Sequence, residues 1–413
     1  MRKLLPVPLF VLLISFQSTA QCPGGRYHDF LFPDATVTSN VIYGSNISQS
    51  GTATNLAMDV YTPNGDGMTN RPLVIVCHGG YFLSGDKAGA DVVPMCRDFA
   101  RMGYVVASIN YRVGVPLTPP LQTPYGQAVV RAVQDLRAAI RWFRKNAAEG
   151  GNTYNINSDM IFVGGDSAGG FMALHLAYLQ EDEIPAWLDL SITGLEGGIE
   201  GQSGNPGYSS EVNAIFSVSG ALGDDNWIDA TDTTPACLFH GDNDATVTID
   251  SGMFSLFGLL DVAVIYGSNP VSAKMTEFGI EHCYKINPGL GHVPYLGNPP
   301  VYTETISIIS NFLSSYICNI SLNCEATPIS INDFQNDQSA LTAYPNPVSD
   351  WVSIEGMNKN STHCFILNSV GQIISSQSLV NTSRVDMRSF SAGIYFLRIE
   401  GNNSSSTIKV IVE

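Results

Sequence analysis

Short apolar runs that end in glycine or aspartate recur through the middle of the chain. They begin at Pro72, Met102, Met160, Ala214 and Ala236 and read PLVIVCHGG, MGYVVASINYR, MIFVGGD, AIFSVSG and ACLFHGD, and a more polar run, CYKINPGLGH, follows at Cys283. Short runs of this kind, rich in β-branched residues, are typical of strands that are buried on both faces of a sheet. The pattern therefore predicts a series of buried strands.

An amphipathic helix is predicted between the second and third of these runs. Apolar residues repeat at alternating spacings of four and three, which places them on one helical face: Val129, Val133, Leu136, Ile140 and Phe143. We expect the basic residues of the opposite face to be exposed: Arg131, Arg137, Arg141 and Lys145. Strands that alternate with helices predict an α/β fold with a mostly parallel central sheet. In such sheets, ligands and catalytic groups lie at the carboxyl ends of the strands.

The pattern changes near Cys318. Residues 319–340 are polar and aperiodic, which indicates a linker. Residues 341–413 carry short strand-like runs separated by Asn, Ser and Gly, among them VSIEG, CFILNSVG, GIYFLRIEG and STIKVIVE. This pattern predicts a small antiparallel β-sandwich. We therefore expect an α/β domain over residues 21–318, a linker over residues 319–340 and an all-β domain over residues 341–413.

The first residues, MRKLLPVPLFVLLISFQSTAQC, have a basic head, a short apolar core and small residues up to Ala20. This layout predicts a signal peptide over residues 1–20, and its apolar core is too short for a good membrane span. Export permits disulfides among the 8 cysteines. The proximity of Cys318 and Cys324 favours a bridge between them, whereas Cys77, inside an apolar run, is expected to be a small buried hydrophobe.

Charge and cysteine spacing narrow the classes of function. The net charge is −17, which argues against binding nucleic acid or an anionic membrane through bulk charge. No pair or cluster of cysteines and histidines has the spacing of a zinc site, so no metal is expected.

The run from Met160 continues into Gly165-Asp166-Ser167-Ala168-Gly169 and then into a second apolar run. The five residues fit G-x-S-x-G, a tight strand-to-helix turn that presents a nucleophilic serine. Side chains two residues before and after that serine would collide, and both are Gly here. The turn also places Ser167 at a helix N-terminus, which favours negative charge. The alternative is a plain glycine-rich turn whose serine caps the helix.

The loop His78-Gly79-Gly80-Tyr81 follows an earlier predicted strand. Acyl transfer needs backbone N–H donors aimed at the oxyanion of the tetrahedral intermediate. We expect one donor from Ala168, the residue after the nucleophile, and another from this His-Gly-Gly loop. Glycine lets the backbone approach a substrate closely. The alternative is an ordinary turn at the end of a strand.

A nucleophilic serine needs a base, and the base needs an acid to orient it, in the chain order Ser, Asp or Glu, His. Four histidines stand between Ser167 and the linker: His175, His240, His282 and His292. We expect His175 to pack along the apolar helix and His282 to open a strand at the end away from the chemistry. No carboxylate in a comparable strand-end loop separates His240 from Ser167. This leaves His292, in a glycine-rich loop, as the predicted base.

The loop after the run from Ala236 offers two carboxylates for the acid, Asp242 and Asp244. Both follow the penultimate strand directly. The residues alone do not separate them.

Six blocks, HGGYFLSGD, VVASINYR, DLRAAIRWFRKNA, GGDSAGG, HGDNDATV and GLGH, resemble the α/β-hydrolase esterases in kind and order over about residues 50–316. The most similar branches are the feruloyl and acetyl-xylan esterases and the hormone-sensitive-lipase-like carboxylesterases. The resemblance implies an α/β-hydrolase fold, no cofactor and no metal. It implies the catalytic residues Ser167, Asp244 and His292 and the oxyanion donors Gly79, Gly80, Tyr81 and Ala168. Tyr81 departs from the small residue of the lipase-like branch, so its ring is expected to shape the acyl pocket.

The C-terminal blocks AYPNPVSDWVSIEG, CFILNSVGQIISSQ, VDMRSFSAGIYFLRIEG and STIKVIV resemble a type IX secretion sorting domain. The hallmarks are Tyr344-Pro345-Asn346-Pro347 and Gly393-Ile394-Tyr395, and the resemblance covers about residues 342–413. It implies that residues 341–413 engage the type IX secretion machinery of a Gram-negative bacterium. The protein would then be secreted or attached to the cell surface. The alternative is a carbohydrate-binding β-sandwich.

Together these features predict a secreted serine carboxylic-ester hydrolase that acts through a Ser-His-Asp triad and an acyl-enzyme. The resemblance points to feruloyl or acetyl esters of polysaccharides as substrates, and residues 112–126 and 196–210 are expected to form specificity loops over the site. One alternative is a secreted serine peptidase of the same fold, although such peptidases usually carry a large extra domain before the hydrolase. The other is a non-catalytic surface or binding protein on a hydrolase scaffold.

Overall fold

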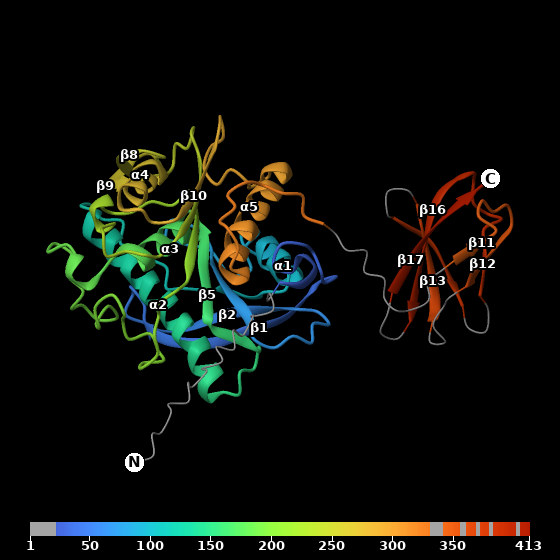
Figure 1. The fold of residues 1–413 in the computed structure, drawn as a ribbon, viewed down its shortest axis with the longest axis horizontal. Helices are drawn as coiled ribbons and strands as arrows, with labels where there is room; N and C mark the ends of the chain where they lie inside the picture. Colours follow the sequence, from blue (N-terminus) through green and yellow to red (C-terminus); the bar gives the residue numbers. More distant parts are fainter. Residues whose placement is uncertain (1–21, 331–341, 356–360, 369–371, 380–382, 402–404) are drawn as a thin grey trace, which may run out of the picture. The chain divides into compact units, whose positions relative to one another are not determined.

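The computed structural model describes residues 22–330, 342–355, 361–368, 372–379, 383–401 and 405–413. The chain divides into two compact units, Met1–Asn332 and Asp333–Glu413, and each is described by itself (Figure 1). The expected signal peptide over residues 1–20 and residues 331–340 of the expected linker lie outside the described residues. Within the part that is described, no helix is long and apolar enough to cross a membrane.

The first unit is built on an eight-stranded sheet in which the strand order is β1-β2-β4-β3-β5-β6-β7-β10. The strands are β1 (Ala35–Ile47), β2 (Ala53–Pro63), β3 (Arg71–Cys77), β4 (Val105–Ile109), β5 (Ile156–Asp166), β6 (Ala214–Val218), β7 (Ala236–Gly241) and β10 (His282–Asn287). All pairs from β4 to β10 are parallel, whereas β2 runs antiparallel to both β1 and β4. This confirms the predicted α/β-hydrolase fold with a mostly parallel sheet.

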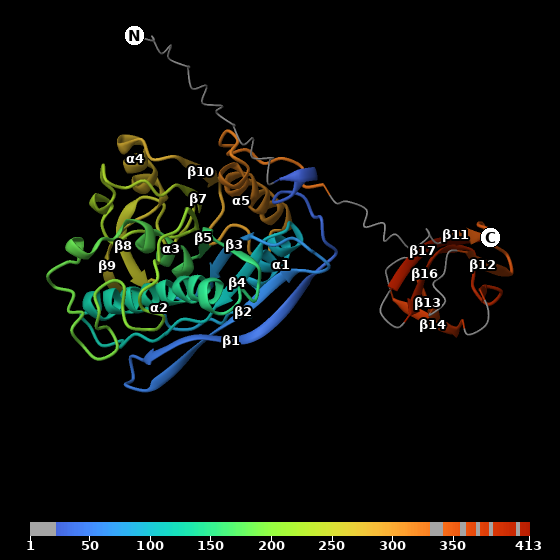
Figure 2. The same cartoon turned by 60° about the horizontal axis from the view of Figure 1, so that its bottom comes forward.

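Helices cover both faces of this sheet (Figure 2). They are α1 (Val93–Arg101), α2 (Gln122–Glu149), α3 (Ala168–Tyr178), α4 (Ser268–Phe278) and α5 (Pro299–Cys318), with short 3₁₀ turns at Pro23–Gly25, Glu181–Glu183 and Asp225–Trp227. Successive side chains of β3 point to opposite faces of the sheet, so neighbouring residues show which helices cover each face. Ile75 shares a core with α2 and α3, and Val76 shares a second core with α1 and α5. Every residue of β3 is buried, which explains the uninterrupted apolar run from Pro72 to Cys77.

The expectation that the arginines of α2 are exposed is wrong. Arg131, Arg137 and Arg141 are buried, and of the four basic residues only Lys145 is exposed. The connection between α3 and β6 folds over this face of the helix, and its Glu200 forms ion pairs with both Arg137 and Arg141. The spacing of apolar residues located the helix but carried no information about a covering segment that has no period of its own.

The expected bridge between Cys318 and Cys324 is also wrong. Cys318 is bonded to Cys22, and Cys324 is bonded to Cys283 at the start of β10. The segment after α5 turns back over the first unit, where Ser307 Oγ donates to the carbonyl of Thr327. Described residues of the expected linker therefore pack on the α/β unit. Cys77 is free and buried, as expected.

The second unit consists of a three-stranded sheet, β11-β12-β15, and a four-stranded sheet, β14-β13-β16-β17. The strands are β11 (Thr342–Tyr344), β12 (Trp351–Glu355), β13 (Ser361–Leu367), β14 (Ile373–Ser378), β15 (Arg384–Asp386), β16 (Gly393–Gly401) and β17 (Ser405–Val412). Neighbouring strands are antiparallel. Val352 and Ile366, from the two sheets, belong to one apolar core. The predicted small all-β domain is confirmed.

Candidate active site

Ser167 occupies the turn between β5 and α3 with φ 51° and ψ −118°, a backbone conformation that non-glycine residues rarely adopt. The turn is tight because two glycines pack against one atom: a Cβ at Gly165 or at Gly169 would collide with the carbonyl oxygen of Cys77. A Cβ at Gly165 would also lie only 3.0 Å from the Cα of Gly169. The sequence motif thus has a steric cause, and the turn leaves Ser167 at the N-terminus of α3.

His292 lies in the loop after β10 and contacts both other predicted triad residues. Its Nε2 is 2.8 Å from Ser167 Oγ, and its Nδ1 is 2.8 Å from Asp244 Oδ2. Because a carboxylate only accepts, Nδ1 carries the proton of that bond and the Nε2 lone pair faces the serine hydroxyl. The structure therefore brings together Ser167, His292 and Asp244, which come from three separate strand ends.

Asp244 is held as a carboxylate by several donors. The N–H groups of Thr246 and Val247 both donate to Oδ1, at 2.9 Å each, and the side chain is fully buried. Burial acts to raise the pKa of this carboxyl, but the hydrogen bonds from His240, His292 and the backbone outweigh it and hold the pKa well below its usual range. Asp244 is therefore ionised at neutral pH.

The hydrogen bonds distinguish Asp244 from Asp242 as the acid that orients the base, a choice that the residues alone left open. Asp242 is exposed and accepts a hydrogen bond from the backbone N–H of Gly289 at 2.6 Å. It contacts neither His292 nor Ser167 among the described interactions. Its side chain instead fixes the loop that carries His292.

His240 contributes to the site in a way that the sequence did not indicate. Its Nε2 lies 2.9 Å from the carbonyl oxygen of Val247 and 3.4 Å from Asp244 Oδ2, and its Nδ1 lies 2.8 Å from Ser268 Oγ. Because the Val247 carbonyl only accepts, Nε2 carries the proton and Nδ1 accepts from the serine. His240 is therefore a fully buried support for the predicted acid. Its only sequence signal was its place at the end of β7.

The predicted oxyanion donors need one correction. The N–H of Gly79 donates to Asp91 Oδ2 at 3.0 Å, so it is not available to a substrate. Gly79 is needed for another reason, since a Cβ there would lie 2.8 Å from Asp166 Oδ2 and 3.3 Å from the Cβ of Ser167. Within the described part of the chain, the N–H groups of Gly80 and Tyr81 meet no acceptor. With the first N–H of α3, at Ala168, they remain as candidate donors.

A buried carboxyl lies directly behind the nucleophile. Asp166 is 2 % exposed, and its Oδ1 has no hydrogen-bond partner among the described residues. Burial, followed by the negative charge of Asp91, raises the pKa of Asp166 to about 8. Asp166 is therefore mostly protonated at neutral pH, next to the carboxylate that holds Gly79.

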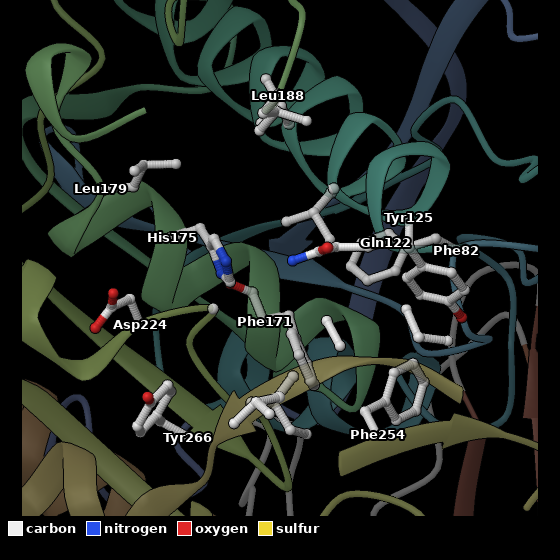
Figure 3. Close-up of a pocket in the computed structure, with 18 of the residues that line it drawn as sticks. Phe82, Gln122, Tyr125, Phe171, His175, Leu179, Leu188, Asp224, Phe254 and Tyr266 are labelled. Carbon is white, nitrogen blue, oxygen red and sulfur yellow. The ribbon is translucent and has the colours of Figure 1, made fainter. Parts of the chain in front are cut away.

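A cavity of about 380 Å³ opens at Ser167. One face of α3 lines it, because Ser167, Phe171, His175 and Leu179 recur every fourth residue. Aromatic rings form much of the remaining wall: Tyr81, Phe82, Tyr125, Trp187, Trp227 and Phe254. Figure 3 shows His175 and Gln122 pointing toward one another across this space. Tyr81 thus lines the cavity, as the sequence predicted, and its ring lies 6.3 Å from that of Phe254.

The expected specificity loops are only half correct. Residues 112–126 contribute Gln122, Tyr125 and Gly126 to the cavity wall, but residues 196–210 contribute none. A two-stranded hairpin that the sequence pattern did not predict, β8 (Ser251–Leu256) and β9 (Leu260–Tyr266), provides a wall instead. Within the described residues, no group of three or more His, Cys, Asp or Glu could hold a metal ion.

Two family models match the chain. Residues 58–223 match the family BD-FAE, and residues 342–413 match the secretion system C-terminal sorting domain. The first match contains the His-Gly-Gly loop and the Ser167 turn. The second contains the described strands of the all-β unit.

Curated relatives are similar over shorter segments. Esterase-5C of Drosophila miranda is 31% identical over 142 residues, which are 34% of this chain and 24% of that protein. The carboxylic ester hydrolase LipN of Mycobacterium tuberculosis is 31% identical over 140 residues, 34% of this chain and 33% of that protein. The chain thus spans only a quarter to a third of the length of these relatives.

Solved structures with a similar fold include a truncated carbohydrate esterase from gut microbiota, with a TM-score of 0.48 and 21% identity, covering 71% of this chain and 99% of that one. The native esterase Est2 of Thermogutta terrifontis has a TM-score of 0.49 and 21% identity, covering 71% of this chain and 96% of that one.

Proposed function

We propose that this chain, whose residues 58–223 are a BD-FAE domain and whose residues 342–413 are a secretion sorting domain, is an exported carboxylesterase. The observation that carries the proposal is the unbroken hydrogen-bonded series Ser167–His292–Asp244, with both bonds at 2.8 Å. Such a series is the arrangement that activates a serine for acyl transfer. The sorting domain directs the protein to the type IX secretion machinery, and so to the cell surface or the medium.

The hydrogen bonds among these three residues support ester hydrolysis through an acyl-enzyme. Ser167 Oγ attacks the ester carbonyl carbon while its proton passes to His292 Nε2, and Asp244 stabilises the imidazolium that forms. The carbon–oxygen bond to the alcohol then breaks, and the alcohol takes the proton from His292. Water attacks the acyl-enzyme, gives its proton to the same nitrogen, and the acid leaves as Ser167 regains a proton.

The negative charge on the former carbonyl oxygen is stabilised by fixed N–H donors. We assign this role to Ala168 at the start of α3 and to Gly80 and Tyr81 in the loop after β3. Donors that are already oriented cost no reorganisation during the reaction, and removing one such donor typically costs about a hundredfold or more in rate. The positive end of the α3 dipole adds to this stabilisation.

The size and lining of the cavity are evidence for a substrate whose acyl group is larger than acetyl. Its aromatic walls and its volume of about 380 Å³ match an aromatic or extended apolar group. We therefore propose a feruloyl ester of a polysaccharide as the substrate, because an acetyl group would leave most of the cavity unfilled. The polysaccharide would then remain outside while the acyl group enters.

The test is turnover of a panel of esters by the wild-type protein and by S167A. We expect hydrolysis of p-nitrophenyl and feruloyl esters, labelling by a serine-reactive fluorophosphonate, and loss of both in S167A with an unchanged thermal transition. Full activity in S167A would remove Ser167 from the mechanism. Absence of labelling in the wild type would favour a non-catalytic binding protein. Faster cleavage of a matched amide than of the ester would favour a peptidase.

A further inference from the structure

The cavity extends well beyond the reacting atoms. It follows the face of α3 formed by Ser167, Phe171, His175 and Leu179. His175 lies eight positions after Ser167, which corresponds to about 12 Å along the axis of α3. A group that is bonded to Ser167 and lies along this face would therefore reach His175 at the end away from its carbonyl. His175 plays no part in the triad.

The protonation state of His175 is fixed by its surroundings. Its Nδ1 lies 2.8 Å from the carbonyl oxygen of Phe171, which only accepts, so Nδ1 carries a proton. Burial lowers the pKa of this imidazole to about 4, so the ring is neutral at neutral pH. A neutral imidazole with the proton on Nδ1 presents an acceptor lone pair at Nε2. A Cβ at Gly223, on the cavity wall, would lie 3.7 Å from this nitrogen.

The rings around His175 favour the binding of a flat substrate group. The Phe171 ring stacks with the imidazole at 6.2 Å between centroids, and the Trp227 ring meets it edge-on at 5.4 Å. Phe171 also contacts Phe82 and Phe254, so aromatic surface continues back toward Ser167. In Figure 3 the imidazole projects into the cavity rather than into the protein core. Aromatic walls with a directed acceptor among them favour a flat ring that carries a hydrogen-bond donor.

We propose that His175 determines specificity by accepting a hydrogen bond, through Nε2, from a hydroxyl group on an aromatic ring of the substrate. The inference rests on the proposed esterase function and refines it, because it names the residue that recognises the hydroxyl of a phenolic ring. His175 is a binding residue and takes no part in proton transfer to or from Ser167.

Matched esters that differ by one hydroxyl test this role. The methyl esters of 4-hydroxycinnamic acid and cinnamic acid place the difference on the acyl side. The acetates of 4-hydroxybenzyl alcohol and benzyl alcohol place it on the alcohol side. For each pair the measured quantity is the ratio of kcat/KM values, hydroxylated over plain. Comparing this ratio between wild type and variant removes the intrinsic reactivity of each ester and any general loss of activity.

We expect H175L to lower the ratio of one pair by about tenfold, which is the contribution of one hydrogen bond. H175Q, whose amide oxygen restores an acceptor, should recover part of it. D224N is the matched control, because Asp224 also lines the cavity. Asp224 caps the turn Asp225–Trp227 through the N–H of Asn226, and Asn caps equally well. Its ratio should equal that of the wild type.

Several outcomes would overturn the proposal. One is a ratio that H175L leaves unchanged in both pairs. Another is a ratio that D224N lowers while H175L does not, which would move the acceptor to Asp224. If H175L does not fold, as judged by its thermal transition, H175F gives the same comparison with a flat ring between Phe171 and Trp227. Failure of the wild type to hydrolyse any ester would instead reject the esterase function itself.

Discussion

His240 and His292 approach the same oxygen of Asp244. The Nδ1 of His292 lies 2.8 Å from Asp244 Oδ2, and the Nε2 of His240 lies 3.4 Å from it. Asp244 Oδ1 accepts two backbone N–H groups in addition. The carboxylate is therefore fixed by two backbone N–H groups and His240, while its Oδ2 also faces the proposed base His292. A carboxylate fixed in this way can keep an imidazole in one tautomer and one orientation.

Asp244→Asn should lower kcat by about three to four orders of magnitude, because an amide next to His292 Nδ1 favours the wrong tautomer. Asp242→Asn is the matched control, since Asp242 lies two residues away and, among the described residues, its side chain accepts a hydrogen bond only from the Gly289 N–H. We expect D242N to keep kcat within about a few-fold of the wild type. Kinetics on one p-nitrophenyl ester with both variants decides. A larger loss in D242N than in D244N would reassign the acid.

His240→Leu should lower kcat by about tenfold or more while leaving KM nearly unchanged. Leucine has no donor for the Val247 carbonyl or for Asp244, and a hydrogen bond to a charged group is worth about 1.5–3 kcal/mol. His240 does not line the cavity, so substrate binding should not change. If KM rose while kcat stayed constant, His240 would not act through the acid.

The local parts of the site could be predicted from the sequence, because their cause is local. The spacing of Gly165 and Gly169 about Ser167 is dictated by the sterics of one turn, and the order of Ser, acid and His follows from the order of the strands. The resemblance to esterases chose Asp244 over Asp242, and the structure supports that choice through one hydrogen bond.

The features of the site that could not be predicted from the sequence depend on contacts between distant segments. His175 could be placed on an apolar helix from its neighbours, but whether that face met the core or a cavity depended on the β8–β9 hairpin, about 80 residues later. The Gly79 N–H was expected to face the substrate, and only the position of Asp91 shows that this N–H already donates a hydrogen bond to a carboxylate. The burial of Arg137 and Arg141 could not be predicted, because their partner Glu200 lies in an aperiodic segment.

Gly169→Ala should lower kcat/KM by about a hundredfold, because its Cβ would collide with the Cys77 carbonyl and displace Ser167, and a displacement of about 1 Å costs this much. Gly67→Ala is the control: a Cβ there meets nothing within 4 Å, and its backbone is not left-handed. We expect G67A to match the wild type in thermal transition and kcat/KM. Unchanged kinetics in G169A would show that the turn can accommodate a Cβ at position 169 without displacing Ser167.

The disulfide Cys283–Cys324 should stabilise the first unit by about 2–4 kcal/mol, because it closes a long loop in the unfolded chain. The bridge ties the segment after α5 to the start of β10, and the sequence separation is 41 residues. C283S/C324S should therefore have a lower free energy of unfolding in urea than the wild type. C364S, which removes a free cysteine of the all-β unit, is the control and should leave the transition of the first unit unchanged. An unshifted midpoint in the double variant would contradict the predicted stabilisation.

Asp166 should make the stability of the first unit fall as pH rises. Its folded pKa of about 8 exceeds the ordinary value of 3.8, so between these values the folded state holds a proton that the unfolded state has released. The contribution of this group is therefore present in full below about pH 4 and is lost progressively up to about pH 8. Asp166→Asn, which is neutral at every pH, removes this dependence. Thermal transitions of D166N and the wild type between pH 5 and pH 8.5 measure it: the variant should gain stability relative to the wild type as pH rises. A difference that stays constant with pH would show that Asp166 is ionised in the folded protein throughout this range.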